Sequence, residues 1–321
     1  MIKGEWITQR EGGVRLDAAL VAAFPSTTRA FVREAVAKGD VLVDSRLASK
    51  GLKLFGGERI FVKELAESAD NIVAPNHDVP LNVVYEDDAI IACDKPCGIA
   101  THPLSRSELL TLANALVARF PECAALGDRP LMAGALHRLD ADTSGLVIFA
   151  RTQDAFAHLR AEFAAHTVEK RYLALVEGRV DESLTIEGDL AHDPTLQYCR
   201  MIDPAKSRLS FSERAKLKLY HAVTSFSPLG HTRVENEERT LLDVRIFTGV
   251  THQIRAQLSS RQIHIVNDRI YGAFAVEDMR GHALHALSAR FIHPKSGVET
   301  VVSTPLPSWA LQWRSCFNCA L

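Results

Sequence analysis

The sequence predicts an α+β fold of two domains in which strands dominate. Three observations favour this prediction. Apolar segments typical of strands recur at residues 172–176, 242–246 and 298–302. Strands and helices do not alternate regularly, as they would in a doubly wound sheet. Charge is unevenly divided along the 321 residues, which indicates a small basic domain and a larger acidic one.

The basic domain is predicted at residues 13–63. Helical spacing and turn residues predict helices at 15–24 and 30–38 and strands at 41–46 and 58–62. Pro25-Ser-Thr-Thr supplies N-cap residues for the second helix, and Gly39 suits its C-terminal end. The domain has nine Lys and Arg against five Asp and Glu, although the whole chain has a formal net charge of −2. Such asymmetry suits a module that anchors a polyanion.

Residues 64–79 are polar and contain Pro75, so we expect a linker there. The second domain is predicted at residues 80–321. We expect two strands around an acidic turn in residues 83–96, and helices at 109–120 and 152–166. The expected second domain is a mostly antiparallel mixed sheet flanked by helices.

Composition excludes several classes of protein. No apolar run approaches the ~18 residues of a membrane span, and the N-terminus is too polar for a signal peptide. We therefore expect a cytoplasmic protein. Cys316 and Cys319 form a C-x-x-C pair without the second ligand pair that structural zinc requires. Reduced thiols and no bound metal are the expectation.

Residues 137–145 are the strongest candidate for chemistry. A His, an Arg and two Asp run directly into the apolar segment 146–150. Such groups are costly to desolvate unless they form ion pairs or hydrogen bonds or take part in a reaction. Motifs of nucleotide-binding folds, zinc metalloproteases and serine hydrolases are absent, which excludes those common classes.

Several motifs, in this order along the chain, resemble the RluA-type pseudouridine synthases. The entry segment is Pro80–Asp88, Asp94-Lys-Pro-x-Gly98 and His102-Pro103. The three main motifs are His137-Arg-Leu-Asp-x-Asp-Thr-Ser-Gly145, Lys170-Arg-Tyr172, and Thr248-Gly-x-Thr-His-Gln-Ile-Arg255 with Asp268 and Tyr271-Gly272. The resemblance extends over residues 13–310. Three positions depart from the family pattern, namely Val250, Gln257 and Asn267, the last where Gly is common.

The resemblance implies an RNA uridine isomerase that needs no metal or organic cofactor. Asp140 is then the catalytic carboxylate, which either attacks carbon or removes a ribose proton. Arg255 is expected to grip Asp140 bidentately. Tyr172 is expected to stack on the flipped uracil and to serve a late proton transfer.

Other residues have expected roles in the same site. Arg138 would contact RNA, filling the gap that the flipped base leaves. Leu139 and Ile254 would form an apolar pocket wall, with ordinary core packing as an equal alternative. Lys170 would be either a phosphate contact or a solvated charge at a strand end.

The basic domain resembles the alpha-L, or S4-like, RNA-binding domain. This resemblance implies that five basic residues contact RNA phosphates: Arg29, Arg33, Lys38, Lys50 and Lys53. The family usually has Asn-Gly after its Val-x-Val strand, whereas this chain has Asp44-Ser45. The turn type therefore stays open.

The expected partner is RNA, bound by a monomer. Family members with this domain tend to act on large-subunit ribosomal RNA, which is our expectation, and transfer RNA is the alternative. Two further hypotheses stay open. One is an RNA-binding ribosome-assembly factor without catalysis. The other is a glycoside or nucleoside hydrolase, which needs two carboxylates roughly 5–9 Å apart.

Overall fold

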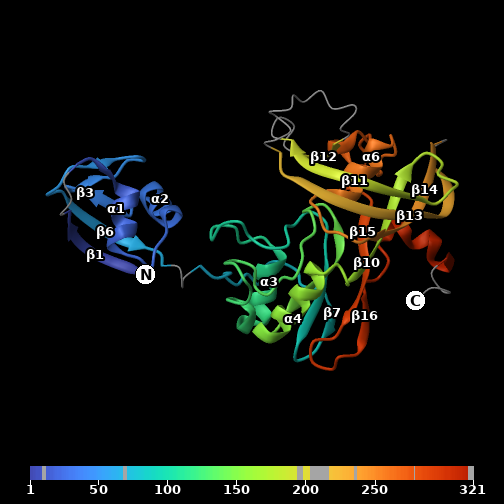
Figure 1. Ribbon diagram of the computed structural model, residues 1–321, viewed down its shortest axis with the longest axis horizontal. Coiled ribbons are helices and arrows are strands. Elements are labelled where there is room, and N and C mark those ends of the chain that lie inside the picture. The colour runs from blue at the N-terminus through green and yellow to red at the C-terminus, as the bar shows by residue number, and fades with distance from the viewer. Residues whose placement is uncertain are drawn as a thin grey trace. The chain divides into compact units, whose positions relative to one another are not determined.

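The computed structural model describes residues 1–8, 12–67, 71–193, 198–202, 217–234, 237–277 and 279–316. The chain divides into two compact units, Met1–Ile72 and Val73–Leu321 (Figure 1). Each unit has its own cluster of buried apolar side chains. The units are described separately below.

The first unit packs two helices on a small antiparallel sheet. The sheet has the order β1-β6-β3-β4, and β2 pairs separately with β5. The bounds are β1 Ile2–Ile7, β2 Val14–Arg15, α1 Leu16–Ala23, α2 Arg29–Lys38, β3 Val41–Val43, β4 Arg46–Leu47, β5 Lys53–Leu54 and β6 Arg59–Leu65. Thr28 caps α2 by accepting a hydrogen bond from the backbone N–H of Phe31, and Gly39 ends the helix at φ 79°.

The turn between β3 and β4 has the backbone that a type I′ hairpin requires. Asp44 and Ser45 have φ of 48° and 66°, and Val43 pairs with Arg46 across them. The Asp44 carboxylate also accepts the backbone N–H of Arg59 at 2.9 Å. Asp-Ser thus forms the same kind of turn that Asn-Gly normally forms.

Both ends of the first unit extend beyond the predicted range of 13–63. Strand β1, which the sequence analysis did not predict, pairs with β6. Part of the expected linker packs on the second unit, because Val73 donates its N–H to Ala124 and the Asn114 amide donates to the carbonyl of Ala74 at 2.7 Å.

The second unit is built on a ten-stranded mixed sheet. Its order is β12-β11-β13-β14-β10-β15-β9-β8-β7, with β16 pairing to β15. The strands are β7 Val83–Glu86, β8 Ile90–Lys95, β9 Ser144–Ala150, β10 Glu169–Glu177, β11 Leu184–Asp193, β12 Tyr198–Ile202, β13 Leu219–Val234, β14 Glu237–Ile246, β15 Leu284–Ile292 and β16 Glu299–Ser303. The helices are α3 Leu112–Arg119, α4 Gln153–Ala164 and α6 Gln253–Ser260, with 3₁₀ turns η2 Pro121–Cys123, η3 Arg269–Tyr271 and η4 Ser308–Cys316.

One parallel join, between β9 and β15, connects two antiparallel halves of this sheet. Only two residue pairs form it, His285 with Ser144 and Ala286 with Gly145. Gly145 has φ 110°, and a Cβ atom there would lie 2.2 Å from the carbonyl oxygen of Ala286. Glycine is therefore required at this join. Helix α4 packs on β9, whereas α6 lies beside β11 and β12 (Figure 1).

The prediction of an α+β fold with a large mixed sheet is confirmed for the second unit. The sequence analysis missed α6 and the hairpin strands β11 to β13. No helix among the described residues is long and apolar enough to cross a membrane. Cys93, Cys97, Cys123 and Cys199 are free thiols. Cys319 and the side chain of Cys316, which form the C-x-x-C pair, lie outside the described residues.

Candidate active site

Asp140 lies in the loop immediately before β9, where its two carboxylate oxygens have different surroundings. Oδ2 accepts a hydrogen bond from Nη1 of Arg255 at 2.7 Å. Oδ1 has no hydrogen-bond partner among the described residues, and the side chain is 20% exposed. One oxygen is therefore anchored, while the other is available to a ligand.

The backbone around Asp140 is fixed on both sides. The Thr101 hydroxyl accepts the N–H of Leu139 at 3.0 Å and donates to the carbonyl of the same residue at 3.2 Å. The N–H of Thr143 donates to the Asp140 carbonyl at 3.1 Å, and its hydroxyl lies 2.8 Å from Nε2 of His282. This preorganises the position of the carboxylate.

A fully buried ammonium group, Lys95, supports the same loop. Its Nζ donates to the carbonyls of Pro96, Ile99 and Ala141 at 2.8–2.9 Å. Burial lowers the pKa of Lys95 to about 8, while nearby anionic side chains, including Asp140, oppose that shift. Lys95 therefore ties the end of β8 to the residue that follows Asp140.

Arg255 reaches Asp140 from α6, whose first turn is fixed by Gln253. The Gln253 side chain accepts from Thr248 and from the backbone N–H of Val250, and donates to Val223 and Thr224. All four bonding directions of this buried amide are used. The start of the helix, and hence Arg255, is held in one orientation.

The bidentate partner of Arg255 is Asp268 and not Asp140, so the prediction of a bidentate Asp140 pair was wrong. Nε and Nη2 of Arg255 donate to the two oxygens of Asp268 at 2.7 and 2.9 Å. Asp140 receives its hydrogen bond from Nη1. The side chains of Arg255 and Asp268 are 4% and 1% exposed, and the two carboxylates together raise the pKa of Arg255.

Asn267 places Asp268 by an unusual backbone conformation. Its φ is 65°, in the left-handed region that Asn tolerates better than most residues. Its side chain donates to the carbonyls of Met279 and Gly281 and accepts the N–H of Val276. The glycine that is common at this position in RluA-type sequences would adopt the same φ but could not make the three side-chain hydrogen bonds.

Tyr172 and His252 lie beside the Asp140 carboxylate. Tyr172 is on β10 and 7% exposed, and burial together with Asp140 raises its pKa. Nε2 of His252 is 3.6 Å from Oδ2 of Asp140, and its Nδ1 bonds the Tyr271 hydroxyl at 3.0 Å. Burial lowers the pKa of His252, so it is neutral near pH 7.

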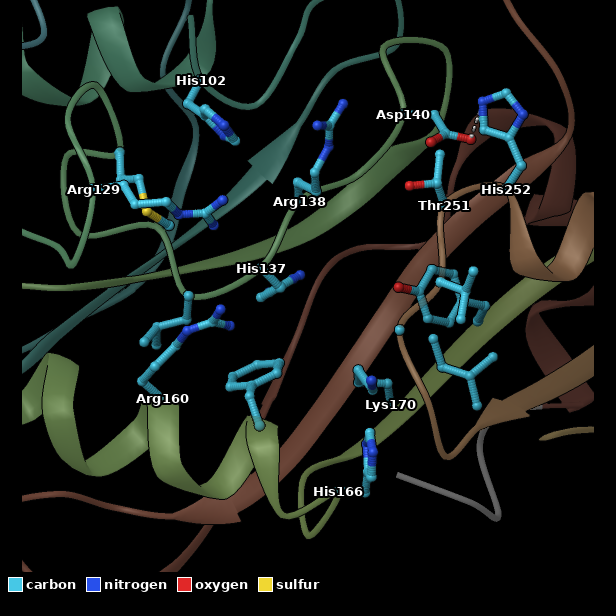
Figure 2. A pocket seen from close by; sticks show the side chains of 17 residues that line it. His102, Arg129, His137, Arg138, Asp140, Arg160, His166, Lys170, Thr251 and His252 are labelled. Carbon is cyan, nitrogen blue, oxygen red and sulfur yellow. Dashed lines mark ion pairs between the residues drawn. The ribbon is translucent and has the colours of Figure 1, made fainter. Parts of the chain in front are cut away.

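These groups open onto a cavity of about 340 Å³. Figure 2 shows Asp140 and His252 at one side of it and Arg129 and Arg160 at the other, with Arg138 between them. Asp140 is the one carboxylate among the described residues that line the cavity. The cationic and histidine side chains that line it are His102, Arg129, His137, Arg138, Arg160, His166, Lys170 and His252. Such a lining suits a polyanion that brings one reacting group to Asp140.

The structure distinguishes between the alternatives stated for three other site residues, and for Leu139 and Ile254 it favours core packing over a pocket wall. Leu139 and Ile254 are 5% and 4% exposed, belong to the apolar core and do not line the cavity. Lys170 lines the cavity but is 8% exposed and donates to the carbonyl of Thr248 at 2.8 Å. The alternative prediction, that Lys170 is a solvated charge at a strand end, is therefore wrong. Arg138 is exposed and forms no ion pair with the described residues.

His137 makes structural contacts on β9 and α4. Its Nε2 accepts the backbone N–H of Ile148 at 3.1 Å, and its ring stacks on Phe163. Loss of hydration, together with Lys170, lowers the pKa of His137 to about 3. Neutral His137 therefore carries its proton on Nδ1.

The five basic residues predicted to bind phosphates are all exposed on the first unit. Two of them have acidic partners within the unit. Arg33 is 3.5 Å from Asp17, and Lys38 is 2.7 Å from Glu34. Arg29, Lys50 and Lys53 have no ion pair among the described residues.

Some residues of the site were missed or only partly identified from sequence. Lys95 and Asp268 belong to the motifs, but their partners became clear only from the fold. Arg129 and Arg160 had no local signal, since isolated arginines on a turn and on a helix are usually surface residues.

The chain is similar to known proteins over most of its length. The family model described as RNA pseudouridylate synthase matches residues 89–260. Ribosomal large subunit pseudouridine synthase D of Xanthomonas campestris is 34% identical over 310 residues, covering 92% of this chain and 86% of the relative. The protein of the same name from Salmonella typhimurium is 31% identical over 315 residues, covering 94% and 90%.

A solved structure, human RNA pseudouridylate synthase domain containing 1, shares the fold at a TM-score of 0.57 and 23% identity. It covers 76% of this chain and 90% of the human chain. The family match, the extent of the sequence similarity and the shared fold lead to one conclusion. The chain belongs to the RNA pseudouridylate synthase family.

Proposed function

We propose that this protein converts specific uridines of large-subunit ribosomal RNA to pseudouridine. The relatives named above carry that ribosomal description, which supports the choice of RNA. The observation that carries the proposal is Asp140 in a cavity with a cationic lining. Its Oδ2 is anchored by Arg255, and its Oδ1 has no hydrogen-bond partner within the described part of the chain.

In the proposed reaction the uridine N1–C1′ bond breaks, the base turns over, and a C5–C1′ bond forms. The C5 proton is lost and N1 gains a proton, so the reaction is an isomerisation. Oδ1 of Asp140 either attacks the ribose or removes a ribose proton. Tyr172 stacks on the base, and its raised pKa keeps its hydroxyl protonated. Arg138 contacts the RNA at the cavity rim.

The first unit supports the choice of a large RNA. We propose that residues 13–63 of this unit form an S4-like RNA-binding domain. Its phosphate contacts would be Arg29, Lys50 and Lys53, which have no ion pair among the described residues, together with Arg33 and Lys38. Phe55, which is 66% exposed, lies two residues after Lys53 and offers a face for base stacking.

Replacement of Asp140 is the test of this proposal. Ribosomal RNA from cells lacking the gene is incubated with the protein, and pseudouridine is mapped by carbodiimide primer extension and mass spectrometry. The wild-type protein is expected to modify defined large-subunit sites, and Asp140→Asn is expected to lose at least about 10⁴-fold in rate while still binding RNA.

Three outcomes would refute or redirect the proposal. Activity that survives Asp140→Asn rejects the role of this carboxylate. Modification of transfer RNA alone rejects the ribosomal target. Binding without modification by the wild-type protein favours an RNA-binding assembly factor.

A further inference from the structure

Asp268 is the feature of the site to which the proposed reaction gives no role. It is 1% exposed, does not line the cavity and therefore does not meet the RNA. Even so, it takes two of the three hydrogen bonds that Arg255 makes to carboxylates. A buried carboxylate with a single cationic partner is costly to keep, so its position calls for an explanation.

We propose that Asp268 is a positioning residue that binds Nε and Nη2 of Arg255 and thereby fixes the orientation of the guanidinium. In that orientation a single N–H, on Nη1, reaches Asp140, and Oδ1 of Asp140 stays free to react. This inference rests on the proposed function of Asp140. An arginine fork pairs bidentately with a carboxylate when its donors are free. Without Asp268, the guanidinium of Arg255 could turn and bind both oxygens of Asp140.

The surroundings of Asp268 fit a fixed position. Its own N–H donates to Ile265, and its carbonyl accepts the N–H groups of Tyr271 and Ala273. The three side-chain bonds of Asn267 close the preceding backbone onto residues 276–281. Arg255 also lies over the Tyr271 ring, 5.0 Å from its centroid. The fork can therefore turn little toward Asp140 while Asp268 is present.

Charge leads to the same expectation. Arg255 binds two carboxylates. The negative charge of Asp268 therefore offsets part of the stabilisation that the positive charge of Arg255 gives to Asp140. Without the negative charge of Asp268, the guanidinium charge would act on Asp140 without an offset, which would stabilise the carboxylate and make it less reactive. The acidic limb of the pH–rate profile should therefore move to lower pH.

The test uses the full chain and RNA labelled with tritium at C5 of uridine, since C5 loses its hydrogen in the proposed reaction. Asp268→Asn is expected to lower kcat by about 10-fold or more, the scale seen for outer partners of ligating groups, with KM unchanged and the acidic limb at lower pH. Asp268→Glu keeps the charge, so it should recover most of kcat and leave the limb at the wild-type position.

Asp243→Asn is the matched control. Asp243 pairs with Arg171, has a side-chain exposure of 9%, between those of Asp268 and Asp140, and does not line the cavity. Arg171 precedes Tyr172 on β10, so its side chain points to the opposite face. This variant should lose thermal stability but keep its rate per folded molecule and its pH profile.

Rates are compared per folded molecule, with the folded fraction taken from circular dichroism at each pH. Wild-type kcat and an unmoved acidic limb in Asp268→Asn would overturn the inference. If Asp268→Asn does not fold, Asp268→Glu decides the matter. A shifted acidic limb in that variant overturns the inference, whereas an unshifted limb with kcat within about threefold of the wild-type value supports it. A wild-type protein that releases no tritium would instead refute the proposed function.

Discussion

At the scale of single residues, the site depends on how hydrogen-bond donors are allotted. Lys95 uses its three N–H groups on three carbonyls, and Arg255 divides its donors between two carboxylates. Neither allotment can be derived from the motifs, because the motifs give residue types and spacing but not which donor meets which acceptor. Asp140 could be identified from its motif, whereas its free oxygen could not.

Asn267 gives a residue-scale prediction about backbone strain. Asn267→Ala should lower the free energy of unfolding by about 2–3 kcal/mol, because alanine is strained at positive φ and the side-chain bonds are lost. Asn267→Gly should recover about 1 kcal/mol of that loss, since glycine accepts the same φ. Urea unfolding of the three proteins measures both values, and equal losses for Ala and Gly would contradict the role of φ.

At the scale of elements, helix ends and turns followed their sequence signals more closely than the long strands did. Thr28 and Thr152 cap α2 and α4 as N-cap preferences predict. Strand β13 was missed because Pro228 and Gly230 interrupt it, and the structure accommodates them with a register shift. Helix α6 was missed because its buried polar residues, Gln253 and Gln257, obscure an apolar stripe.

The first unit gives an element-scale prediction about RNA binding. A double variant, Arg29→Ala with Lys53→Ala, should weaken binding to ribosomal RNA and lower the slope of log affinity against log salt by about 1–2, because each phosphate contact releases counterions. At saturating RNA the turnover rate should not change. Filter binding at several salt concentrations measures the slope.

Lys63→Ala is the control for that double variant. Lys63 lies on β6, 3.8 Å from Asp40, and is not among the proposed phosphate contacts. Its replacement removes a positive charge from the same unit and should leave the slope nearly unchanged. A slope that falls equally in Lys63→Ala would point to a general charge effect.

At the scale of the whole molecule, the fold class and the family could be predicted because short motifs recur in a fixed order along the chain. The arrangement of the sheet could not, because Ser144 and His285 are adjacent in space and 141 residues apart in sequence. No local pattern encodes such a pairing. The cationic lining of the cavity depends on the same long-range packing, since Arg129 and Arg160 come from separate segments.

Buried histidines give a prediction about acid stability. His282 and His285 are 5% and 2% exposed, and burial lowers the pKa of each to about 4. Their unfolded pKa is near 6.5, so below that pH the unfolded chain binds protons that the folded chain does not. Stability should be greatest above pH 6.5 and should fall as pH drops toward 4, by up to about 1.4 kcal/mol per pH unit for each histidine.

His285→Gln tests this prediction away from the cavity. Between pH 6.5 and 4, the free energy of unfolding of the variant should fall less steeply with decreasing pH. The difference in slope should correspond to about one bound proton fewer on unfolding. Urea unfolding across that pH range gives the slope. An unchanged slope would exclude His285 as a source of acid sensitivity.

The two-pair join between β9 and β15 has a consequence for how activity returns on refolding. Asp140 belongs to the half of the sheet that ends in β9, whereas Tyr172 and Arg255 belong to the other half. Each half can gain its hairpins from contacts close in sequence, but the join needs contacts between segments about 140 residues apart, which form slowly. During refolding, secondary structure should therefore return before enzymatic activity, and the closure of this join, together with the long-range pairing of β10 with β15, should account for the delay.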